Sequence, residues 1–333
     1  MKYLTYQRHG APRPGLLLDD RHIVDIPRLC RQMKVRPAST LLSVIERGPD
    51  LWSILEGAVA SEDPASLPVI PFDEVRLCAP LSRVPKMHCY SVYEAHMQRS
   101  LEAVLAMRVH PWLARLARRG GLIRLPKSWY QKPTYYKGNP TSLIGPDDEL
   151  PYPKHTEMLD YEMELALIVG QRGMDIEPGD ARGYIFGYTI FNDFSARDVL
   201  IRELLRGRVG PLKGKDFEYG NAIGPWIVTP DELGDPHGID MRVWVNGELA
   251  GAASTSGMSH TIDALLVESS RTEALVPGQL IATGVPAGGC GLESQRFLKP
   301  GDRVRIEIDG IGRLENRIVA SEPERMQEVS DAA

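Results

Sequence analysis

Two glutamates separated by one residue open the most informative segment of the chain. Residues 161–170 read Tyr-Glu-Met-Glu-Leu-Ala-Leu-Ile-Val-Gly, so Glu162 and Glu164 precede an apolar strand predicted at Leu165–Val169. Successive side chains of a strand point to opposite faces, and the two carboxylates are therefore expected on one face. Two adjacent anions beside an apolar strand need a compensating positive charge. A hard divalent cation with oxygen ligands, Mg²⁺ or Mn²⁺ before Zn²⁺, would supply that charge.

A third carboxylate follows the next predicted strand. Residues 183–192 are apolar and rich in aromatic side chains, and they lead into Asp193, after which a helix is predicted up to about Arg206. Ser195, with Asp198 three residues later, resembles a capping box at the start of this helix. Taken singly, these carboxylates are typical of a solvated edge strand and an ordinary turn. Together, three carboxylates at the ends of two consecutive strands indicate a hard metal with open positions for substrate or water.

Five segments, in this order, resemble the fumarylacetoacetate hydrolase superfamily. They are Leu159–Val169 (LDYEMELALIV), Gly187–Asp198 (GYTIFNDFSARD), Gly214–Thr229 (GKDFEYGNAIGPWIVT), Val245–Met258 (VNGELAGAASTSGM) and Pro277–Gly289 (PGQLIATGVPAGG). The resemblance implies that Glu162, Glu164 and Asp193 are metal ligands and that Mg²⁺ or Mn²⁺ is the ion. It also implies an α+β fold that is mainly β, the family's mixed β-sandwich roll, with a small N-terminal domain.

His96, in a Tyr-Glu-Ala-His segment, resembles the catalytic histidine of the family, which works with a glutamate to activate a water molecule. Imidazole suits this role because it exchanges a proton near neutral pH. By residue pattern alone, His96 is more typical of the polar face of an amphipathic helix. Shorter family members place the glutamate three residues later, where this chain has Arg99; longer members take it from a C-terminal segment, for which Glu293 is the candidate. Longer members also have an aspartate ligand where this chain has Cys89.

Further residues match positions of the family that contact substrate. Lys215, in a Gly-Lys-Asp-Phe segment, matches a lysine that stabilises an oxyanion and the leaving enolate, and Lys213 is a competing candidate. The resemblance gives substrate contacts to Tyr136 and Thr283 as well. It gives one to Arg197 too, with a structural role in fixing the carboxylate loop as the alternative. The ordinary alternatives are solvated lysines and core packing.

The resemblance implies an enzyme, a metal-dependent hydrolase that cleaves a carbon–carbon bond in a β-dicarbonyl or acylpyruvate-type small molecule. Because Arg99 replaces the glutamate of the short members, a second hypothesis stays open, in which the same metal site decarboxylates a 2-oxo acid, isomerises a keto–enol pair or hydrates a substrate. A third and weaker hypothesis is a binding protein without turnover. Val285 and Leu200 replace polar residues of the family, which makes the pocket more apolar and disfavours the family's best-known acidic substrate.

Composition excludes several other classes. With 333 residues, a formal net charge of −5 and a pI near 6.0, no basic surface points to nucleic acid or to an anionic membrane, and the basic run 115–124 is interpreted as a solvated face. No apolar run approaches the roughly 20 residues of a membrane helix, and the first residues lack a signal-peptide core. The four cysteines have neither metal nor disulfide spacing, which indicates a reduced, cytoplasmic protein. The expected partners are a small oxo acid or diketone and, by resemblance, a second copy in a homodimer.

Local patterns predict the elements that must position these residues. A small domain is predicted at 1–80 and a catalytic domain at 81–333. Strands are predicted at 2–7, 15–18, 22–24, 75–77, 279–283, 303–309 and 312–319, helical stretches at 40–56, 94–119 and 259–270, and a polar connector at 61–71. Pro111 is expected to kink or restart the second helical stretch. Asn246-Gly247 predicts a type I′ hairpin turn. Long crossover helices are scarce, which excludes a doubly wound nucleotide-binding fold.

Overall fold

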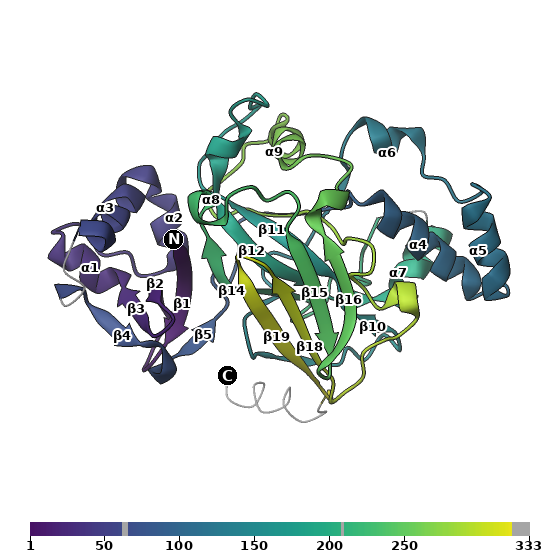
Figure 1. The fold of residues 1–333 in the computed structure, drawn as a ribbon, viewed down its shortest axis with the longest axis horizontal. Helices are drawn as coiled ribbons and strands as arrows, with labels where there is room; N and C mark the ends of the chain where they lie inside the picture. Colours follow the sequence, from purple (N-terminus) through teal and green to yellow (C-terminus); the bar gives the residue numbers. More distant parts are fainter. Residues whose placement is uncertain (62–65, 208–209, 322–333) are drawn as a thin grey trace.

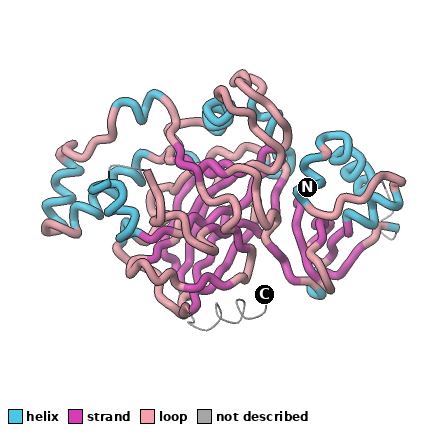
Figure 2. Tube along the Cα trace, turned by 180° about the vertical axis from the view of Figure 1, so that it is seen from behind, coloured by secondary structure: helices cyan, strands magenta, loops and turns pink. Residues whose placement is uncertain are grey.

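Three parts of the chain follow one another along the longest axis of the molecule (Figure 1). The structure is a computed structural model that describes residues 1–61, 66–207 and 210–321. The N-terminal part, drawn in purple and blue, lies at one end, two sheets fill the middle, and the helices α4, α5 and α6 lie at the other end. The view from behind shows the same order, with strands concentrated in the middle of the molecule (Figure 2).

The described residues of the N-terminal part form five strands and three α-helices. They are β1 (Lys2–Gln7), β2 (Arg13–Asp19), β3 (His22–Asp25), α1 (Ile26–Gln32), α2 (Leu41–Glu46), α3 (Gly48–Ser61), β4 (Val69–Pro71) and β5 (Arg76–Cys78). The strands predicted here are confirmed, whereas the single helical stretch at 40–56 is two helices. Gly48 has a φ of 73°, a left-handed conformation that ends one helix and starts the next. Part of the predicted connector, residues 62–65, lies outside the described residues.

The larger sheet runs through both the N-terminal part and the middle of the molecule. Its strands follow the order β4-β3-β2-β1-β14-β12-β11-β17-β6-β7, with β5 paired to β1 and β8 paired to β14. The strands not yet bounded are β6 (Met87–Tyr90), β7 (Tyr135–Lys137), β8 (Leu143–Ile144), β11 (Met163–Val169), β12 (Ile185–Asp193), β14 (Asn221–Val228) and β17 (Leu280–Ala282). Because β1 pairs with β14, the sheet continues across residue 80. The division into domains at that residue stays a prediction.

A five-stranded sheet packs against the larger one. Its order is β16-β15-β18-β19-β9, with bounds β9 (Glu149–Pro151), β15 (Asp240–Val245), β16 (Glu248–Ser254), β18 (Arg303–Ile308) and β19 (Gly312–Val319). Asn246 and Gly247 join β15 to β16 with φ of 54° and 82°, so the predicted type I′ turn is confirmed. A two-stranded sheet joins β10 (Leu159–Asp160) to β13 (Ser195–Ala196). The fold is therefore α+β and mainly β, as predicted.

Strand β11 divides the core between its two faces. Met163, Leu165, Leu167 and Val169 belong to the core cluster shared with the five-stranded sheet. Ala166 and Ile168 belong to the other core cluster, which includes the N-terminal helices. Since side chains alternate along a strand, Glu164 lies on the face of Ala166, at the end of an apolar row. All seven residues of β11 are buried, so the carboxylate of Glu164 enters the protein rather than the solvent.

Six further α-helices lie in the described part of the chain. They are α4 (Glu94–Ala106), α5 (Pro111–Arg119), α6 (Lys127–Gln131), α7 (Arg197–Arg202), α8 (Pro230–Leu233) and α9 (Ile262–Ser270). Pro111 starts α5, which confirms the predicted restart. The capping box predicted at Ser195 is wrong, because Ser195 pairs in β13 with Asp160 and α7 begins two residues later without a side-chain cap. None of the helices in the described ranges combines the length and apolar composition needed to cross a membrane.

Candidate functional site

Three buried carboxylates meet where β11 and β12 lie side by side. Glu164 lies on β11 and Asp193 ends β12, while Glu162 precedes β11. One oxygen from each residue lies within 4.8 Å of the others, and all three residues are buried. The Glu-x-Glu spacing thus places both glutamates on one face, as the sequence predicts, and the antiparallel neighbour brings Asp193 to them.

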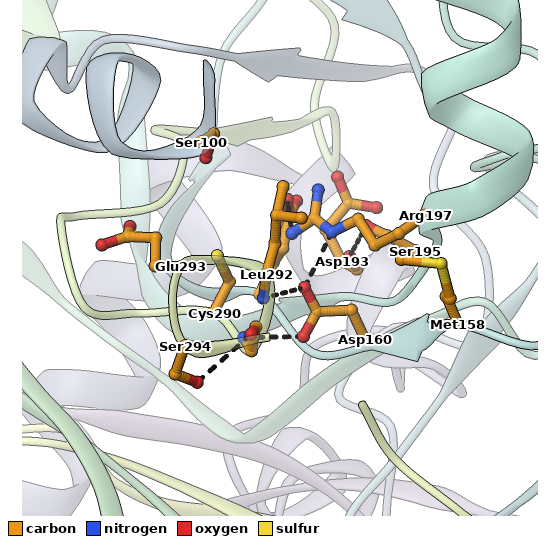
Figure 3. A network of polar contacts seen from close by, with 12 residues as sticks. Ser100, Met158, Asp160, Asp193, Ser195, Arg197, Cys290, Leu292, Glu293 and Ser294 are labelled. Carbon is orange, nitrogen blue, oxygen red and sulfur yellow. Dashed lines mark hydrogen bonds and ion pairs between the residues drawn. The ribbon is translucent and has the colours of Figure 1, made fainter. Parts of the chain in front are cut away.

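Arg197 holds the cluster from one side. Its Nε donates to Oδ2 of Asp160 over 2.7 Å (Figure 3). Its Nη2 forms an ion pair of 2.6 Å with Oε1 of Glu162. The arginine side chain is 5% exposed and that of Asp160 is fully buried. A planar guanidinium can serve two carboxylates at once, which an ammonium group does with less directional control. The interpretation of Arg197 as a residue that fixes the carboxylate loop agrees with these contacts.

Lys215 holds the cluster from the other side. Its Nζ lies 2.5 Å from Oε2 of Glu162 and 2.8 Å from Oδ2 of Asp193, and it is buried. Tyr136, on β7, donates its hydroxyl to the same oxygen of Asp193. The pKa of Lys215 is raised, because Asp193 and Glu162 outweigh the effect of burial, which would lower it. Lys215 is therefore a charged donor at the centre of the site.

The carboxylates differ in how strongly they hold a proton. Burial would raise the pKa of Glu162, but Arg197 and Lys215 lower it to about 2. At Glu164, burial acts together with the negative charges of Asp193 and Glu162, and the pKa is raised well above its ordinary value. Burial likewise raises the pKa of Asp193, against the opposing effect of Lys215. The site therefore has more buried negative charge than its own cations neutralise.

These donors fit a hard divalent cation. Oδ1 of Asp193 is buried and has no hydrogen-bond partner among the described residues. With Asp160, the site holds four buried carboxylates beside two buried cations, Arg197 and Lys215, so full ionisation of the carboxylates leaves two negative charges in excess. Carboxylate oxygens are the ligands of Mg²⁺ and Mn²⁺, and no sulfur or imidazole nitrogen belongs to this group of three. Glu162, Glu164 and Asp193 could therefore hold Mg²⁺ or Mn²⁺.

A histidine–carboxylate pair lies beside the cluster. Nδ1 of His96, on α4, lies 2.8 Å from Oε1 of Glu293, which is carried by the short 3-10 helix Leu292–Ser294. The backbone N–H of Gly288 donates to the other oxygen of Glu293 over 3.0 Å. Cys290 forms an isolated β-bridge with Glu162 and places its Sγ 4.0 Å from Nδ1 of His96, which connects the pair to the cluster. The arrangement can accept and return a proton next to a metal site.

Two residues predicted to contact substrate do not reach the carboxylate cluster with a free polar group. Lys213 is 70% exposed and pairs with Asp216, so Lys215 is the lysine that reaches the carboxylates. Thr283 is fully buried, and its hydroxyl donates to the backbone carbonyl of Leu165. Tyr136 and Arg197 both contact the cluster directly, as described above. The assignment of substrate contacts stays a prediction for all four residues.

Asp160 is a positioning residue that the sequence interpretation missed. Its two oxygens accept hydrogen bonds from Arg197 and from the backbone N–H groups of Gly291 and Leu292, at 2.7 to 2.9 Å (Figure 3). It thereby ties the segment that carries Glu293 to the segment that carries Glu162. The signal was present, because Asp160, Glu162 and Glu164 continue the same two-residue spacing.

Comparisons with known proteins agree with this geometry. A family model described as fumarylacetoacetate (FAA) hydrolase C-terminal matches residues 108–319. The chain is 36% identical to oxaloacetate tautomerase fahd2, mitochondrial, of Xenopus laevis over 323 residues, which cover 96% of this chain and 90% of that protein. It is 31% identical to oxaloacetate tautomerase Fahd2a, mitochondrial, of Rattus norvegicus over 282 residues, 84% of this chain and 80% of that protein.

Solved structures show the same fold. Fumarylacetoacetate hydrolase from Exiguobacterium antarcticum superposes with a TM-score of 0.73 at 30% identity, covering 96% of this chain and 99% of that one. Maleylpyruvate hydrolase from Sphingobium sp. SYK-6, solved with manganese(II) ion and pyruvate, superposes with a TM-score of 0.70 at 24% identity, covering 97% of this chain and 100% of that one. At 24% identity, the likeness to maleylpyruvate hydrolase shows the fold alone.

Proposed function

The chain belongs to the fumarylacetoacetate hydrolase family, and on that premise we propose that it interconverts the keto and enol forms of a small 2-oxo acid. The observation that carries the proposal is the pair of His96 and Glu293 beside the carboxylate cluster. A proton-transfer pair next to a metal site is sufficient for this reaction, which moves one proton and breaks no carbon–carbon bond. The relatives named oxaloacetate tautomerases make oxaloacetate the first substrate to test.

Glu162, Glu164 and Asp193 would hold Mg²⁺ or Mn²⁺. When bound, the ion would act as a Lewis acid toward the carbonyl oxygen of the 2-oxo acid and so acidify the hydrogens of the adjacent carbon. The cluster offers only carboxylate oxygens, which suits both ions. The neighbour solved with manganese(II) ion and pyruvate supports a divalent ion and a 2-oxo acid as the pair to test in this chain.

His96 would move the proton. Glu293 accepts a hydrogen bond from the protonated Nδ1, which leaves Nε2 with a free electron pair. Nε2 then removes a proton from carbon 3 of the substrate, and the electrons of that C–H bond form the double bond between carbons 2 and 3. The reverse step returns the proton to carbon 3 when the enol is the substrate.

Lys215 would stabilise the oxygen at carbon 2. Its buried ammonium group already lies between Glu162 and Asp193, so it is held at the place where negative charge develops. An N–H donor fixed in a buried site stabilises such an oxygen more than solvent does. The oxygen takes a proton from solvent to give the enol, and His96 releases the proton from carbon 3 to solvent, so the numbers of protons gained and lost are equal.

Hydrolysis of a carbon–carbon bond is the second candidate. The same pair of His96 and Glu293 favours hydrolysis, because Glu293 is the candidate for the water-activating glutamate that longer family members take from a C-terminal segment. The 30% identity to a protein named fumarylacetoacetate hydrolase supports it as well. Hydrolysis requires a water molecule held between His96 and an electrophilic carbon, a requirement that keto–enol exchange does not have.

The two candidates differ in their products. Purified protein with Mg²⁺ or Mn²⁺ is given oxaloacetate in deuterium oxide, and the loss of protons at carbon 3 is followed by nuclear magnetic resonance. The same protein is given a panel of acylpyruvates and 1,3-diketones, with cleavage products identified by mass spectrometry. We expect faster exchange than with the ion alone and than with His96→Ala. No acceleration of exchange would sink the tautomerase proposal, and cleavage of the panel would establish hydrolysis instead.

Location and assembly are also proposals. The cysteine pattern favours the cytoplasm, and the four cysteines are free and buried, whereas several relatives carry the word mitochondrial in their names. Family resemblance favours a homodimer. Fractionation of the source cells and light scattering of the purified protein measure these two properties directly.

A further inference from the structure

A second group of metal-ligating side chains lies next to the carboxylate cluster and differs from it in chemistry. Nδ1 of His96, Sγ of Cys290 and a carboxylate oxygen of Glu293 all lie within 4.8 Å of one another. His96 and Cys290 are 7% and 3% exposed, and the side chain of Glu293 is 7% exposed. We propose that these three residues form a zinc site that inhibits the enzyme when it is filled.

The distances suit a tetrahedral ion. Zn²⁺ bonds of about 2.0–2.3 Å to nitrogen, oxygen and sulfur place neighbouring ligand atoms roughly 3.4–3.6 Å apart. Nδ1 of His96 lies 2.8 Å from Oε1 of Glu293 and 4.0 Å from Sγ of Cys290, on either side of that spacing. To reach that spacing, these two distances must change by roughly 0.6 and 0.4 Å, and the fourth position is left for water.

The surroundings hold each ligand in a suitable orientation. Nε2 of His96 lies 3.4 Å from the hydroxyl of Ser100, one turn further along α4, so the ring can keep its proton on Nε2 while Nδ1 binds metal. Gly288 donates its N–H to Oε2 of Glu293, which leaves Oε1 directed toward His96. Figure 3 shows Cys290 and Glu293 on the same side of Asp160, the residue whose hydrogen bonds fix their loop.

The ligand type selects the ion. One sulfur, one imidazole nitrogen and one carboxylate match Zn²⁺, which accepts soft and borderline ligands, whereas Mg²⁺ and Mn²⁺ prefer oxygen alone. The cluster of Glu162, Glu164 and Asp193 offers oxygen alone. The two neighbouring sites are therefore expected to bind different ions at the same time.

Inhibition is expected because proton transfer and zinc binding both require Nδ1 of His96. Proton transfer requires Nδ1 of His96 to carry a hydrogen that Glu293 accepts, and zinc requires the electron pair of that same nitrogen. An enzyme with zinc in this site therefore lacks its proton-transfer pair while its Mg²⁺ or Mn²⁺ site is still filled. This consequence rests on the proposed function, but zinc binding itself does not.

The experiment measures binding separately from activity. Zn²⁺ is titrated by calorimetry into protein saturated with Mg²⁺, and Co²⁺ is added in place of Zn²⁺ to detect the thiolate charge-transfer absorption in the near ultraviolet. The variants are Cys290→Ser and Cys290→Ala, each checked by thermal melting, with Cys78→Ser as a matched control. Cys78 is a buried cysteine on β5 and contacts Arg76 rather than a histidine.

We expect one equivalent of Zn²⁺ in the wild type and in Cys78→Ser. We expect at least about tenfold weaker binding and no thiolate absorption in both Cys290 variants. The inhibition of activity by Zn²⁺ should weaken in parallel. Equal zinc affinity in wild type and both Cys290 variants overturns the proposal, and so does release of zinc by excess Mg²⁺, which would place zinc in the carboxylate cluster. If zinc binds as expected and no keto–enol exchange is found, the proposed function fails while the zinc site stands.

Discussion

Nδ1 of His96 lies 2.8 Å from Oε1 of Glu293, although 197 residues separate them in the chain. Arg99, which stands where the short family members have their glutamate, donates from Nη1 to the other oxygen of Glu293 over 3.4 Å. Arg99 and His96 therefore contact the same carboxylate, and Glu293 takes the place of the glutamate that the short members have at the position of Arg99. This arrangement gives His96 a partner for its Nδ1 proton and directs the basic Nε2 away from Glu293.

Replacing Glu293 by glutamine tests whether this pair carries the chemistry. Glutamine keeps the size of the side chain but removes the charge that stabilises the imidazolium ion formed during proton transfer. We expect Glu293→Gln to lower kcat about 10²-fold and to leave Mn²⁺ affinity within about twofold. Steady-state kinetics and calorimetry measure the two quantities. Glu94→Gln is the control, because Glu94 lies on α4, the helix that carries His96, but contacts Gln98 and Tyr130. An equal loss in both variants would contradict the assignment.

Metal binding and proton transfer should separate in two alanine variants. Glu164→Ala removes one of three carboxylates, and we expect loss of both Mn²⁺ affinity and activity, because a weakly held hard cation depends on the number of charged ligands. His96→Ala should keep Mn²⁺ affinity and lose roughly 10²–10⁴-fold in rate. Calorimetry and kinetics on both proteins provide the comparison. If His96→Ala weakens metal binding as much as Glu164→Ala does, His96 is a ligand or a structural residue.

Periodicity and local motifs predicted the carboxylate cluster because its geometry follows from neighbouring strands. The spacing of Glu162 and Glu164 puts them on one face, and Asp193 ends the strand that pairs with theirs. The fold was predicted from the resemblance to a family, because five segments of the chain match that family in the same order. The hairpin at Asn246 and Gly247 was likewise predictable, because its turn requires residues that accept positive φ.

The remaining features depend on contacts between segments far apart in the chain. Asp160 accepts hydrogen bonds from the loop that carries Glu293, and no local pattern encodes the contact of Glu293 with His96. The capping box at Ser195 failed for the same reason, since β10 holds Ser195 in an extended strand against its local preference. The local preference of Ser195 for a helix cap was therefore overridden by its pairing with Asp160 in the two-stranded sheet.

Removing the charge of Arg197 should destabilise the fold as well as the site. Arg197 is buried and pairs with both Asp160 and Glu162, so Arg197→Met leaves Asp160 without its charged partner and Glu162 with Lys215 alone. We expect a loss of about 3–5 kcal/mol in the free energy of unfolding, measured by urea denaturation, together with weaker metal binding. Arg202→Met is the matched control, because Arg202 ends the same helix, is 52% exposed and pairs only with Asp198 among the described residues. A change in the control beyond about 0.5 kcal/mol would show that helix α7, rather than the buried pairs, is responsible.

His88 should make the protein less stable in acid. It is 1% exposed, stacks on Tyr135 with ring centroids 4.1 Å apart, and burial lowers its pKa to about 4. In the unfolded chain a histidine titrates near pH 6.5, so between about pH 6.5 and 4 the unfolded state binds a proton that the native state does not. The free energy of unfolding therefore falls as the pH falls through this window. Above the window His88 is neutral in both states and adds no pH dependence to that free energy. By about pH 4 this loss amounts to roughly 3 kcal/mol, at about 1.4 kcal/mol for each unit of pKa difference. His88→Gln should remove this part of the pH dependence, measured by urea denaturation at several pH values, whereas His237→Gln, at an exposed position, should keep it. The same slope in His88→Gln and wild type would show that other groups cause the acid sensitivity.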